Sequence, residues 1–537
     1  MRRMPSFGGV SRRRFLAGLA ATAAVGACIS DGRTDGGDGA GPATTASITV
    51  PPDLPPGLFA VGVASGDPRP DSVILWTRLA PEPTAGGGMP PVDVPVEWEV
   101  AADGDFEDVV ASGTAVATPE LAHSVHVDSG GLEPATAYRY RFKVGDQISA
   151  VGTTRTAPGD EDGPERLRFA FASCQHFEQG YYTAHRALAA EDLDLVVFLG
   201  DYIYEGGPAD PGLGHPRRHT TPEPVDLAGY RNRYGEYKAD PDLQAAHAAF
   251  AWVCTWDDHE VEDNYAGAVG GSSGVGTGPD AFLRRRAAAY QAYYEHQPLR
   301  LDPPDGPDYA IHRTQRWGGL ARFFVLDTRQ YRSDQVCGPL GAGPVCPEVD
   351  DPARTMLGAA QEEWLDAELA ATEAAWNVVA QQVVLSQVAV PIGDQLAVSF
   401  EAWDGYRAAR QRLLDRLAGG VPNPVVISGD VHASAAGNLH ADASDPSTPV
   451  VAAELVTTSI SSATDPGWIA LVETARATSP AARYADARRR GYVVCDVTPQ
   501  RWRADFRYVS TALEPTAEVT TGATCALVAG AAGLQPG

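Results

Sequence analysis

Positive charge is scarce in this sequence, and the scarcity excludes two kinds of partner. The 537 residues include 42 lysines and arginines against 69 aspartates and glutamates, so the formal net charge is −27. Binding to nucleic acid draws on a basic surplus that neutralises phosphates and releases counterions, and adhesion to an anionic membrane draws on the same surplus. We therefore expect no nucleic-acid-binding module and no loose attraction to anionic membranes.

Long apolar runs are also missing. The stretch from residue 16 to residue 25 has the length of a signal-peptide core and is too short to span a bilayer. It follows the run S-R-R-R-F-L at Ser11–Leu16, which is typical of a twin-arginine export signal. We interpret residues 1–28 as this signal and residues 29–57, rich in Gly, Asp and Pro, as a flexible linker.

The signal ends at V-G-A-C, which resembles a lipobox and makes Cys28 a candidate lipid anchor. The alternative is cleavage after Ala27 and full release of the protein. Export by the twin-arginine route predicts an extracellular, periplasmic or cell-surface lipoprotein location. The sequence does not indicate an oligomeric state.

Cysteine is limited to seven residues, although an exported protein can hold disulfides. Cys337 and Cys346 flank a Gly/Pro loop and are a plausible pair. A bond between Cys495 and Cys525 is a further alternative that spacing alone cannot decide. Cys254 lies inside an apolar run and is expected to be a buried thiol.

The first structured region is expected to be all-β and to cover residues 58–157. Val96–Val100 and Ser124–Val127 alternate apolar and polar residues with a period of two. The run L-E-P-A-T-A-Y at Leu132–Tyr138 is the pattern of a tyrosine corner, in which a Tyr hydroxyl bonds back to the backbone. These features predict an immunoglobulin- or fibronectin-like sandwich.

Strands alternate with helical stretches from Arg166 onward, which predicts a layered α/β domain over residues 166–512. Residues 513–537 are expected to be a C-terminal tail. The fold class is therefore α/β with an N-terminal β-sandwich. Helices are expected over residues 181–191, 280–296, 357–371 and 406–418.

Five strand-like apolar runs each end in a residue that can bind a metal. The endings are Cys174, Asp201, Asp257–Glu260, Gln387 and Asp430–His432. Because the carboxyl ends of strands form the ligand crevice of an open α/β sheet, the five endings can converge on one site. Together they indicate a metal-dependent hydrolase.

A two-metal hydrolase needs one carboxylate that bridges both ions and clamps them about 4 Å apart. Asp201 is the best candidate, because it follows an apolar run and begins a turn. Three residues later, Tyr204 can supply a phenolate that suits ferric iron, and Cys174 can add a thiolate.

Three of the endings resemble the metal motifs of the calcineurin-like and purple acid phosphatases. They are G-D-x-x-Y at Gly200–Tyr204, x-D-H-E at Asp257–Glu260 and G-x-V-H at Gly429–His432. The sequence departs from that superfamily where Cys174 replaces an Asp, Asp258 replaces an Asn and Asp430 replaces a His.

These departures resemble the PhoD-type alkaline phosphatases. So do S-C-Q at residues 173–175, W-D-D-H-E at 256–260 and L-D-T-R at 326–329. G-V-A-S-G-D-P at 62–68, with L-W-T-R at 75–78, resembles the small β-domain of the same family. The resemblance implies a metallophosphatase domain with a two-sheet core, and it covers nearly all of the chain after the signal.

The resemblance also implies a site with one ferric iron and one or two calcium ions. By motif matching, the iron ligands would be Cys174, Asp201, Tyr204 and His432, and the calcium ligands Asp201, Asp258 and Asp430. Oxygen-only ligation favours calcium over zinc. Asp257 is not counted as a ligand, and Gln387 stands where the superfamily has a further His, which leaves its role open.

Two further residues are expected to act on the substrate. His259 matches the residue that contacts phosphate or protonates the leaving group. Arg329, in L-D-T-R, is a candidate phosphate clamp because a guanidinium grips phosphate bidentately. An ion pair at the end of a strand is the alternative role for Arg329.

The expected function is an exported alkaline phosphomonoesterase or phosphodiesterase that acts on small phosphate esters. A hydroxide or oxide activated by the metals would attack phosphorus and release inorganic phosphate. A phospholipase D-like or nucleotide phosphodiesterase on the same site is one alternative. A non-catalytic cell-surface binding lipoprotein is the alternative from another class, and intact ligand endings argue against it.

Overall fold

The computed structural model describes residues 49–271, 278–338, 341–392, 395–479 and 481–535. The predicted signal, Cys28 and the linker up to residue 48 lie outside the described residues. None of the helices in the described part of the chain combines the length and the apolar character that crossing a bilayer would require.

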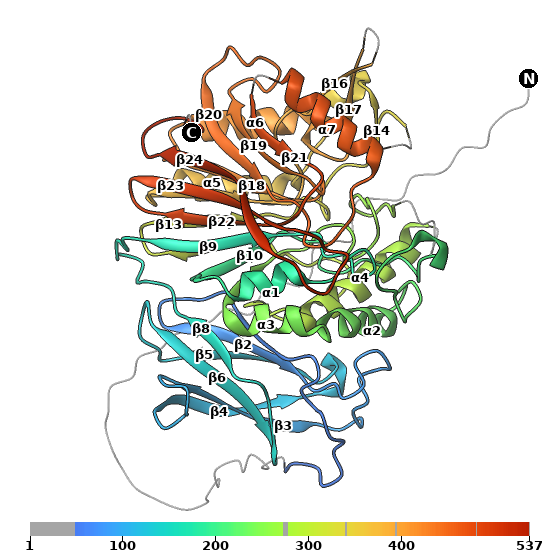
Figure 1. Ribbon diagram of the computed structural model, residues 1–537, viewed down its shortest axis with the longest axis vertical. Coiled ribbons are helices and arrows are strands. Elements are labelled where there is room, and N and C mark those ends of the chain that lie inside the picture. Colours follow the sequence, from blue (N-terminus) through green and yellow to red (C-terminus); the bar gives the residue numbers. More distant parts are fainter. Residues whose placement is uncertain (1–48, 272–277, 339–340, 393–394, 480, 536–537) are drawn as a thin grey trace, which may run out of the picture. The chain divides into compact units, whose positions relative to one another are not determined.

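Within the described residues, a nine-stranded and a seven-stranded β-sheet pack face to face (Figure 1). Across the first sheet the strands are β24 (Val519–Val528), β23 (Arg501–Val509), β22 (Arg490–Val497), β9 (Leu167–Ala172), β10 (Leu195–Phe198), β11 (Ala251–Cys254), β1 (Val63–Gly66), β2 (Ser72–Arg78) and β5 (Ser124–Gly130). Across the second they are β12 (Arg313–Trp317), β13 (Ala321–Val325), β15 (Trp376–Ala380), β18 (Pro424–Ser428), β20 (Val450–Val456), β19 (Ser434–His440) and β21 (Ala482–Asp486). The expected two-sheet core is confirmed.

The alternation of residues along β9 shows how the layers form. Phe169 and Phe171 point into the core between the two sheets, whereas Ala170 and Ala172 face the opposite side, where helices pack. Strands β9, β10 and β11 run parallel to one another, as do β13, β15, β18 and β20. Their carboxyl ends therefore share one edge of each sheet.

Helices cover the outer faces of both sheets. The nine-stranded sheet packs against α1 (Thr183–Ala189), α2 (Leu227–Lys238), α3 (Pro241–Ala249) and α4 (Pro279–His296). The seven-stranded sheet packs against α5 (Gly358–Ala370) and α6 (Arg407–Ala418), and α7 (Pro466–Thr478) contacts β21. The four expected helices are found as α1, α4, α5 and α6, within about two residues at each end.

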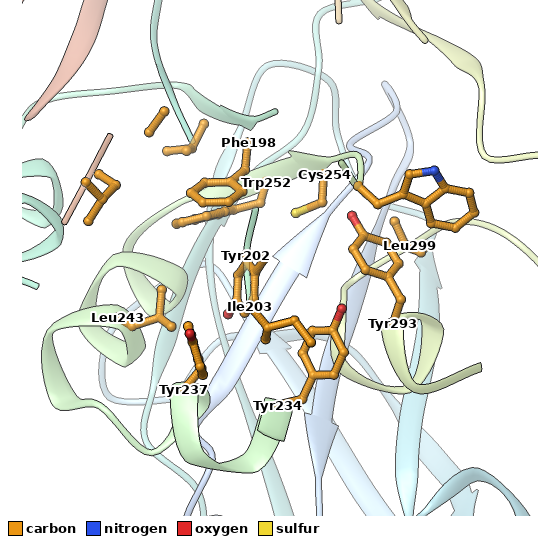
Figure 2. Close-up of a cluster of buried hydrophobic side chains, with 14 of the residues drawn as sticks. Phe198, Tyr202, Ile203, Tyr234, Tyr237, Leu243, Trp252, Cys254, Tyr293 and Leu299 are labelled. Carbon is orange, nitrogen blue, oxygen red and sulfur yellow. The ribbon is translucent and has the colours of Figure 1, made fainter. Parts of the chain in front are cut away.

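Helices α2, α3 and α7 were not predicted. In α2 the buried stripe consists of tyrosines at helical spacing, Tyr230, Tyr234 and Tyr237, which pack with Tyr202 and Trp252 under the sheet (Figure 2). Tyrosine serves in a buried stripe when its hydroxyl finds a partner. The Tyr237 hydroxyl accepts hydrogen bonds from the backbone N–H groups of Phe177 and Tyr204, both at 3.1 Å.

The N-terminal β-region is a sandwich, and one of its layers belongs to the larger core. A five-stranded sheet packs against β1, β2 and β5 around shared apolar side chains; it is made of β4 (Val109–Ala117), β3 (Val94–Ala101), β6 (Ala137–Val144), β7 (Gln147–Ile148) and β8 (Gly152–Arg155). Strand β1 pairs in parallel with β11, so the β-region and the α/β region share the nine-stranded sheet. The tyrosine corner is confirmed, because the Tyr138 hydroxyl accepts a 2.9 Å hydrogen bond from the N–H of Glu133.

The C-terminal residues are not a tail as expected. Strand β24 pairs with β23 over its length and forms one border of the nine-stranded sheet.

Cys495 on β22 and Cys525 on β24 are free thiols with β23 between them, too far apart for the disulfide left open above. The pairing of Cys337 with Cys346 is confirmed. A small sheet beside it contains β14 (Ala342–Pro344), β17 (Gln395–Ser399) and β16 (Val390–Ile392).

Candidate metal centre

Four of the predicted ligands lie at strand ends in an unusual backbone conformation. Cys174, Asp201, Asp430 and His432 have φ of 59°, 55°, 65° and 51°, four of the twelve non-glycine residues with positive φ in the described part of the chain. Left-handed backbone costs free energy for side chains other than glycine, and residues of this kind concentrate at functional sites. The strand ends are thus turned sharply toward a common point.

The first group of ligand atoms joins the ends of β9, β10 and β18. The Cys174 sulfur, an Asp201 oxygen and a His432 nitrogen lie within 4.8 Å of one another. The Tyr204 hydroxyl donates to Asp201 Oδ2 at 2.8 Å and lies 2.9 Å from His432 Nε2. His432 Nδ1 donates to the carbonyl of Ala463 at 2.9 Å, which leaves the Nε2 lone pair facing this group.

The second group is acidic and adjoins the first. Oxygens of Asp257, Asp258 and Asp430 lie within 4.8 Å of one another, and Asp201, Asp258 and His259 form a third group of the same kind. Asp201 and Asp258 thus connect the sulfur- and nitrogen-containing side of the site with its oxygen-only side. The two sides of the site therefore share a carboxylate, as a ligand that bridges two metal ions requires.

Arg329 lies behind the acidic group and not in the open site. Its guanidinium is fully buried, with Nε donating to Asp257 and Nη2 donating to Asp430 at 2.7 Å. The same Nη2 lies 3.3 Å from Asp258 Oδ1. These contacts form the ion pairs of the alternative role, whereas Nη1 is buried without a hydrogen-bond partner among the described residues, so the phosphate-clamp role of Arg329 stays a prediction.

The side chains present fit bound cations. Asp201 Oδ1 and Asp257 Oδ2 are buried without a hydrogen-bond partner among the described residues, which costs free energy unless another group satisfies them. Burial raises the pKa of the Cys174 thiol and of the Asp201 carboxyl well above their usual ranges. Cations at this point would stabilise the ionised ligands, with sulfur, phenol and imidazole suited to iron and carboxylates to calcium.

His259 sits beside the carboxylates with one nitrogen fixed. Its Nδ1 donates to Glu205 Oε2 at 2.7 Å, and its ring packs against that of Tyr204 at a tilt of 32°, with centroids 4.1 Å apart. Although burial opposes the charged form, Glu205, Asp201 and Asp258 raise the pKa of His259 well above its usual value. The imidazole is therefore held with a proton available on Nε2.

Glu260 was quoted in the motif without a role, and the structure gives it one. Its carboxylate is fully buried and accepts hydrogen bonds from the backbone N–H groups of Asp201 at 3.1 Å, Asp257 at 2.6 Å and Tyr202. One side chain therefore fixes the turns after β10 and β11 relative to each other. Only the spatial neighbourhood reveals this role.

Gln387 does not join the ligand groups. The loop after β15 is held by Glu454, which accepts hydrogen bonds from the N–H groups of Leu385 and Ser386, both at 2.8 Å, and from Ser428 Oγ at 2.7 Å. This loop directs Gln387 to a cavity on the outer side of the seven-stranded sheet. Its expected convergence with the other four strand endings stays a prediction.

Gly200→Ala is expected to lower the free energy of unfolding by about 2–4 kcal/mol. Gly200 has φ of 103°, and a Cβ there would lie 2.5 Å from both the Cβ and the backbone N of Asp257. Denaturant unfolding measures the change. Gly86→Ala is the control, because its φ of 77° carries similar strain with nothing within 4 Å; equal losses in the two variants would contradict the close approach.

The chain is similar to known proteins over most of its length. The family model described as PhoD-like phosphatase, N-terminal domain, matches residues 46–158, and the PhoD-like phosphatase model matches residues 169–506. Alkaline phosphatase D of Bacillus subtilis (strain 168) is 47% identical over 482 residues, which cover 89% of this chain and 82% of that protein. A solved structure of PhoD is similar with a TM-score of 0.84 and 46% identity, over 89% of this chain and 91% of its own. The chain is a phosphatase and belongs to the PhoD-like phosphatase family.

Proposed function

We propose that this phosphatase hydrolyses small phosphate mono- and diesters with one ferric iron and one or two calcium ions. The observation that carries the proposal is the sharing of Asp201 between two groups of ligand atoms, one with Cys174 and His432 and one with Asp258 and His259. A bridging carboxylate between chemically different sites is what a mixed two-metal centre needs.

In this proposal the two sides of the site hold different ions. Iron would be bound by the thiol, phenol, imidazole and shared carboxylate of Cys174, Tyr204, His432 and Asp201, and calcium by Asp201, Asp258 and Asp430. The contact between Tyr204 and Asp201 Oδ2 at 2.8 Å supports the first set, and the oxygen-only acidic group supports the second.

The bound ions would polarise the phosphoryl group and activate the attacking water. His259 Nε2 would give its proton to the leaving oxygen, with Glu205 holding the ring through Nδ1. Arg329 would hold Asp257, Asp258 and Asp430 in place, and its charge favours their ionised forms against the effect of burial. His432 stays neutral, since burial lowers its pKa to about 4, and a neutral imidazole can donate its Nε2 lone pair.

The metal proposal is tested by the elemental content of natively exported protein together with turnover of p-nitrophenyl phosphate and bis-p-nitrophenyl phosphate. We expect one iron and at least one calcium per chain and hydrolysis of both esters. A single zinc per chain would contradict the assignment, and hydrolysis of the monoester alone would restrict the function to a phosphomonoesterase.

Tyr204→Phe is expected to remove the visible absorption of a ferric phenolate while calcium is retained. The reason is that the variant lacks the phenol oxygen but keeps Asp201, Asp258 and Asp430. An absorption spectrum and the metal content are measured on the same sample. Tyr202→Phe is the matched control, because Tyr202 is buried two residues away and its hydroxyl contacts His247 at 2.8 Å, outside the ligand groups. An unchanged spectrum in Tyr204→Phe would contradict the role of Tyr204.

We further propose that the chain is exported by the twin-arginine route, with Cys28 as a candidate lipid anchor. The run at Ser11–Leu16 and the V-G-A-C sequence support this. The division into a sandwich over residues 58–157 and a metallophosphatase domain over 166–512 is kept as a proposal. Replacing Arg12 and Arg13 by lysine should retain the precursor inside the cell, which fractionation of the host would detect.

A further inference from the structure

Helix α7 lies over an apolar cavity of about 320 Å³ on the outer side of the seven-stranded sheet. Residues of strands β19 and β21 line one side of it, and residues of α7 line another. Helix α7 lies beside β21 in the fold (Figure 1). The side chains that define it are mostly aliphatic: Ala435, Leu439, Leu396, Trp468, Val472 and Ala475. The volume lies at the lower end of the range of small-molecule sites.

The side chains of helix α7 do not fill the cavity beneath the helix. Trp468, Val472 and Ala475 recur at i, i+4 and i+7 on the face of α7 that lines the cavity, yet none of the residues of α7 is buried. An amphipathic helix normally packs such a stripe tightly into the core. Apolar cavities that side chains leave unfilled tend to stay dry and accept apolar ligands.

The cavity adjoins the loop that carries two of the proposed metal ligands. Val431 lines it and stands between Asp430 and His432 in the same loop. The start of α7 is fixed to this loop, because Trp468 Nε1 donates to the carbonyl of Val431 at 2.9 Å and Thr464 Oγ1 donates to the carbonyl of His432 at 2.8 Å. One short loop therefore carries two proposed ligands and also forms a wall of the cavity.

Gln387 gives this cavity a polar side chain. It lies in the loop between β15 and β16, and β15 pairs with β18, which Asp430 and His432 follow. Its half-buried side chain forms no hydrogen bond with another described residue. Gln387, one of the five strand endings found in the sequence, thus lies in the wall of the cavity. A ligand held here would have its polar end at the ligand loop and its apolar part under α7.

We propose that the cavity is a subsite for the apolar alkyl group of a phosphodiester whose phosphorus lies at the metal centre. The inference rests on the proposed phosphodiesterase function and names the kind of ester that this site would prefer. Because removal of apolar surface from water drives such binding, catalytic efficiency should increase with the length of the alkyl chain until the cavity is full.

The test is the hydrolysis of p-nitrophenyl alkyl phosphates with chains of one to eight carbons. All members share one leaving group, so kcat/KM reports the alkyl contribution. We expect kcat/KM to increase about fourfold for each of the first added methylene groups. Ala475→Phe, which fills the cavity, should flatten this dependence, whereas Ala477→Phe, on the exposed face of the same helix, should keep it. Thermal unfolding of both variants checks that they fold.

Two results would overturn the subsite: a flat dependence in the unsubstituted enzyme, or an unchanged dependence in Ala475→Phe. Hydrolysis of p-nitrophenyl phosphate and of the methyl diester in the same assay tests the proposed function separately. If neither ester is hydrolysed, the proposed function fails, and calorimetric binding of methyl- and octylphosphonate then decides the subsite. Tighter binding of octylphosphonate that Ala475→Phe abolishes supports it, and equal binding of the two phosphonates overturns it.

Discussion

Asp201→Ala is expected to yield a folded protein that holds neither metal and has lost at least roughly 10⁴-fold in kcat/KM. Asp201 contributes to both groups of ligand atoms, so its removal takes one ligand from each ion at once. Removal of a ligand that serves one ion alone, as in Asp430→Ala, should lower calcium and leave iron bound. Elemental analysis and steady-state kinetics on the same preparations measure both effects.

Asp192→Ala is the control for this prediction, because its carboxylate is 94% exposed and remote from the site. It should retain both metals and full activity. Full iron occupancy in Asp201→Ala would show that the two ions do not share this carboxylate. The loss of both metals from Asp430→Ala as well would mean that the site loads as a single unit.

His259→Asn is expected to reduce kcat by about 10²- to 10³-fold for esters with alkyl leaving groups. A poor leaving group needs the proton that His259 Nε2 carries, whereas p-nitrophenolate departs without one. The loss for p-nitrophenyl esters should therefore stay below about tenfold. Rates for a series of leaving groups of increasing pKa, measured on both proteins, give the comparison.

Glu205→Gln is the matched variant for His259, since it keeps the hydrogen bond to Nδ1 but removes the negative charge that raises the pKa of His259. It should show the same dependence on leaving group with a smaller loss. If His259→Asn lost the same factor for every leaving group, the assignment of proton donation would be wrong, and a role in holding phosphate would replace it.

Much of the site follows from the order of residues along the chain. The apolar runs before Cys174, Asp201, Asp258 and Asp430 predict strands, and the carboxyl ends of parallel strands meet at one edge of a sheet. The convergence of these side chains needs only that rule. Gln387 follows the same rule, but its side chain lines a cavity beside α7, at the end of a loop backbone that Glu454 holds.

The roles of Glu260 and Arg329 could not be predicted in this way. Glu260 acts on the backbone of Asp201, 59 positions earlier in the chain, and Arg329 pairs with aspartates from two other strand ends. Neither partner is visible in local sequence. The positive φ at Cys174 is equally hidden, because cysteine carries no preference for left-handed backbone.

The pairing of distant strands was harder to predict from the sequence than the strands and helices themselves. Alternating residues in Val96–Val100 correctly indicate a sandwich strand, yet the same pattern does not reveal that β1 pairs with β11. Strand β24 was missed because its residues are mostly small and exposed, as suits a strand at the border of a sheet. Both the sheet that β1 joins and the existence of β24 depend on pairing between segments that are distant in the sequence.

The most direct test of the shared metal centre is a crystal structure of the natively exported enzyme with anomalous signals that distinguish iron from calcium. The account predicts an iron signal among Cys174, Asp201, Tyr204 and His432 and a calcium signal among Asp201, Asp258 and Asp430, about 4 Å apart. A single metal signal, or two signals of which only one contacts Asp201, would contradict it.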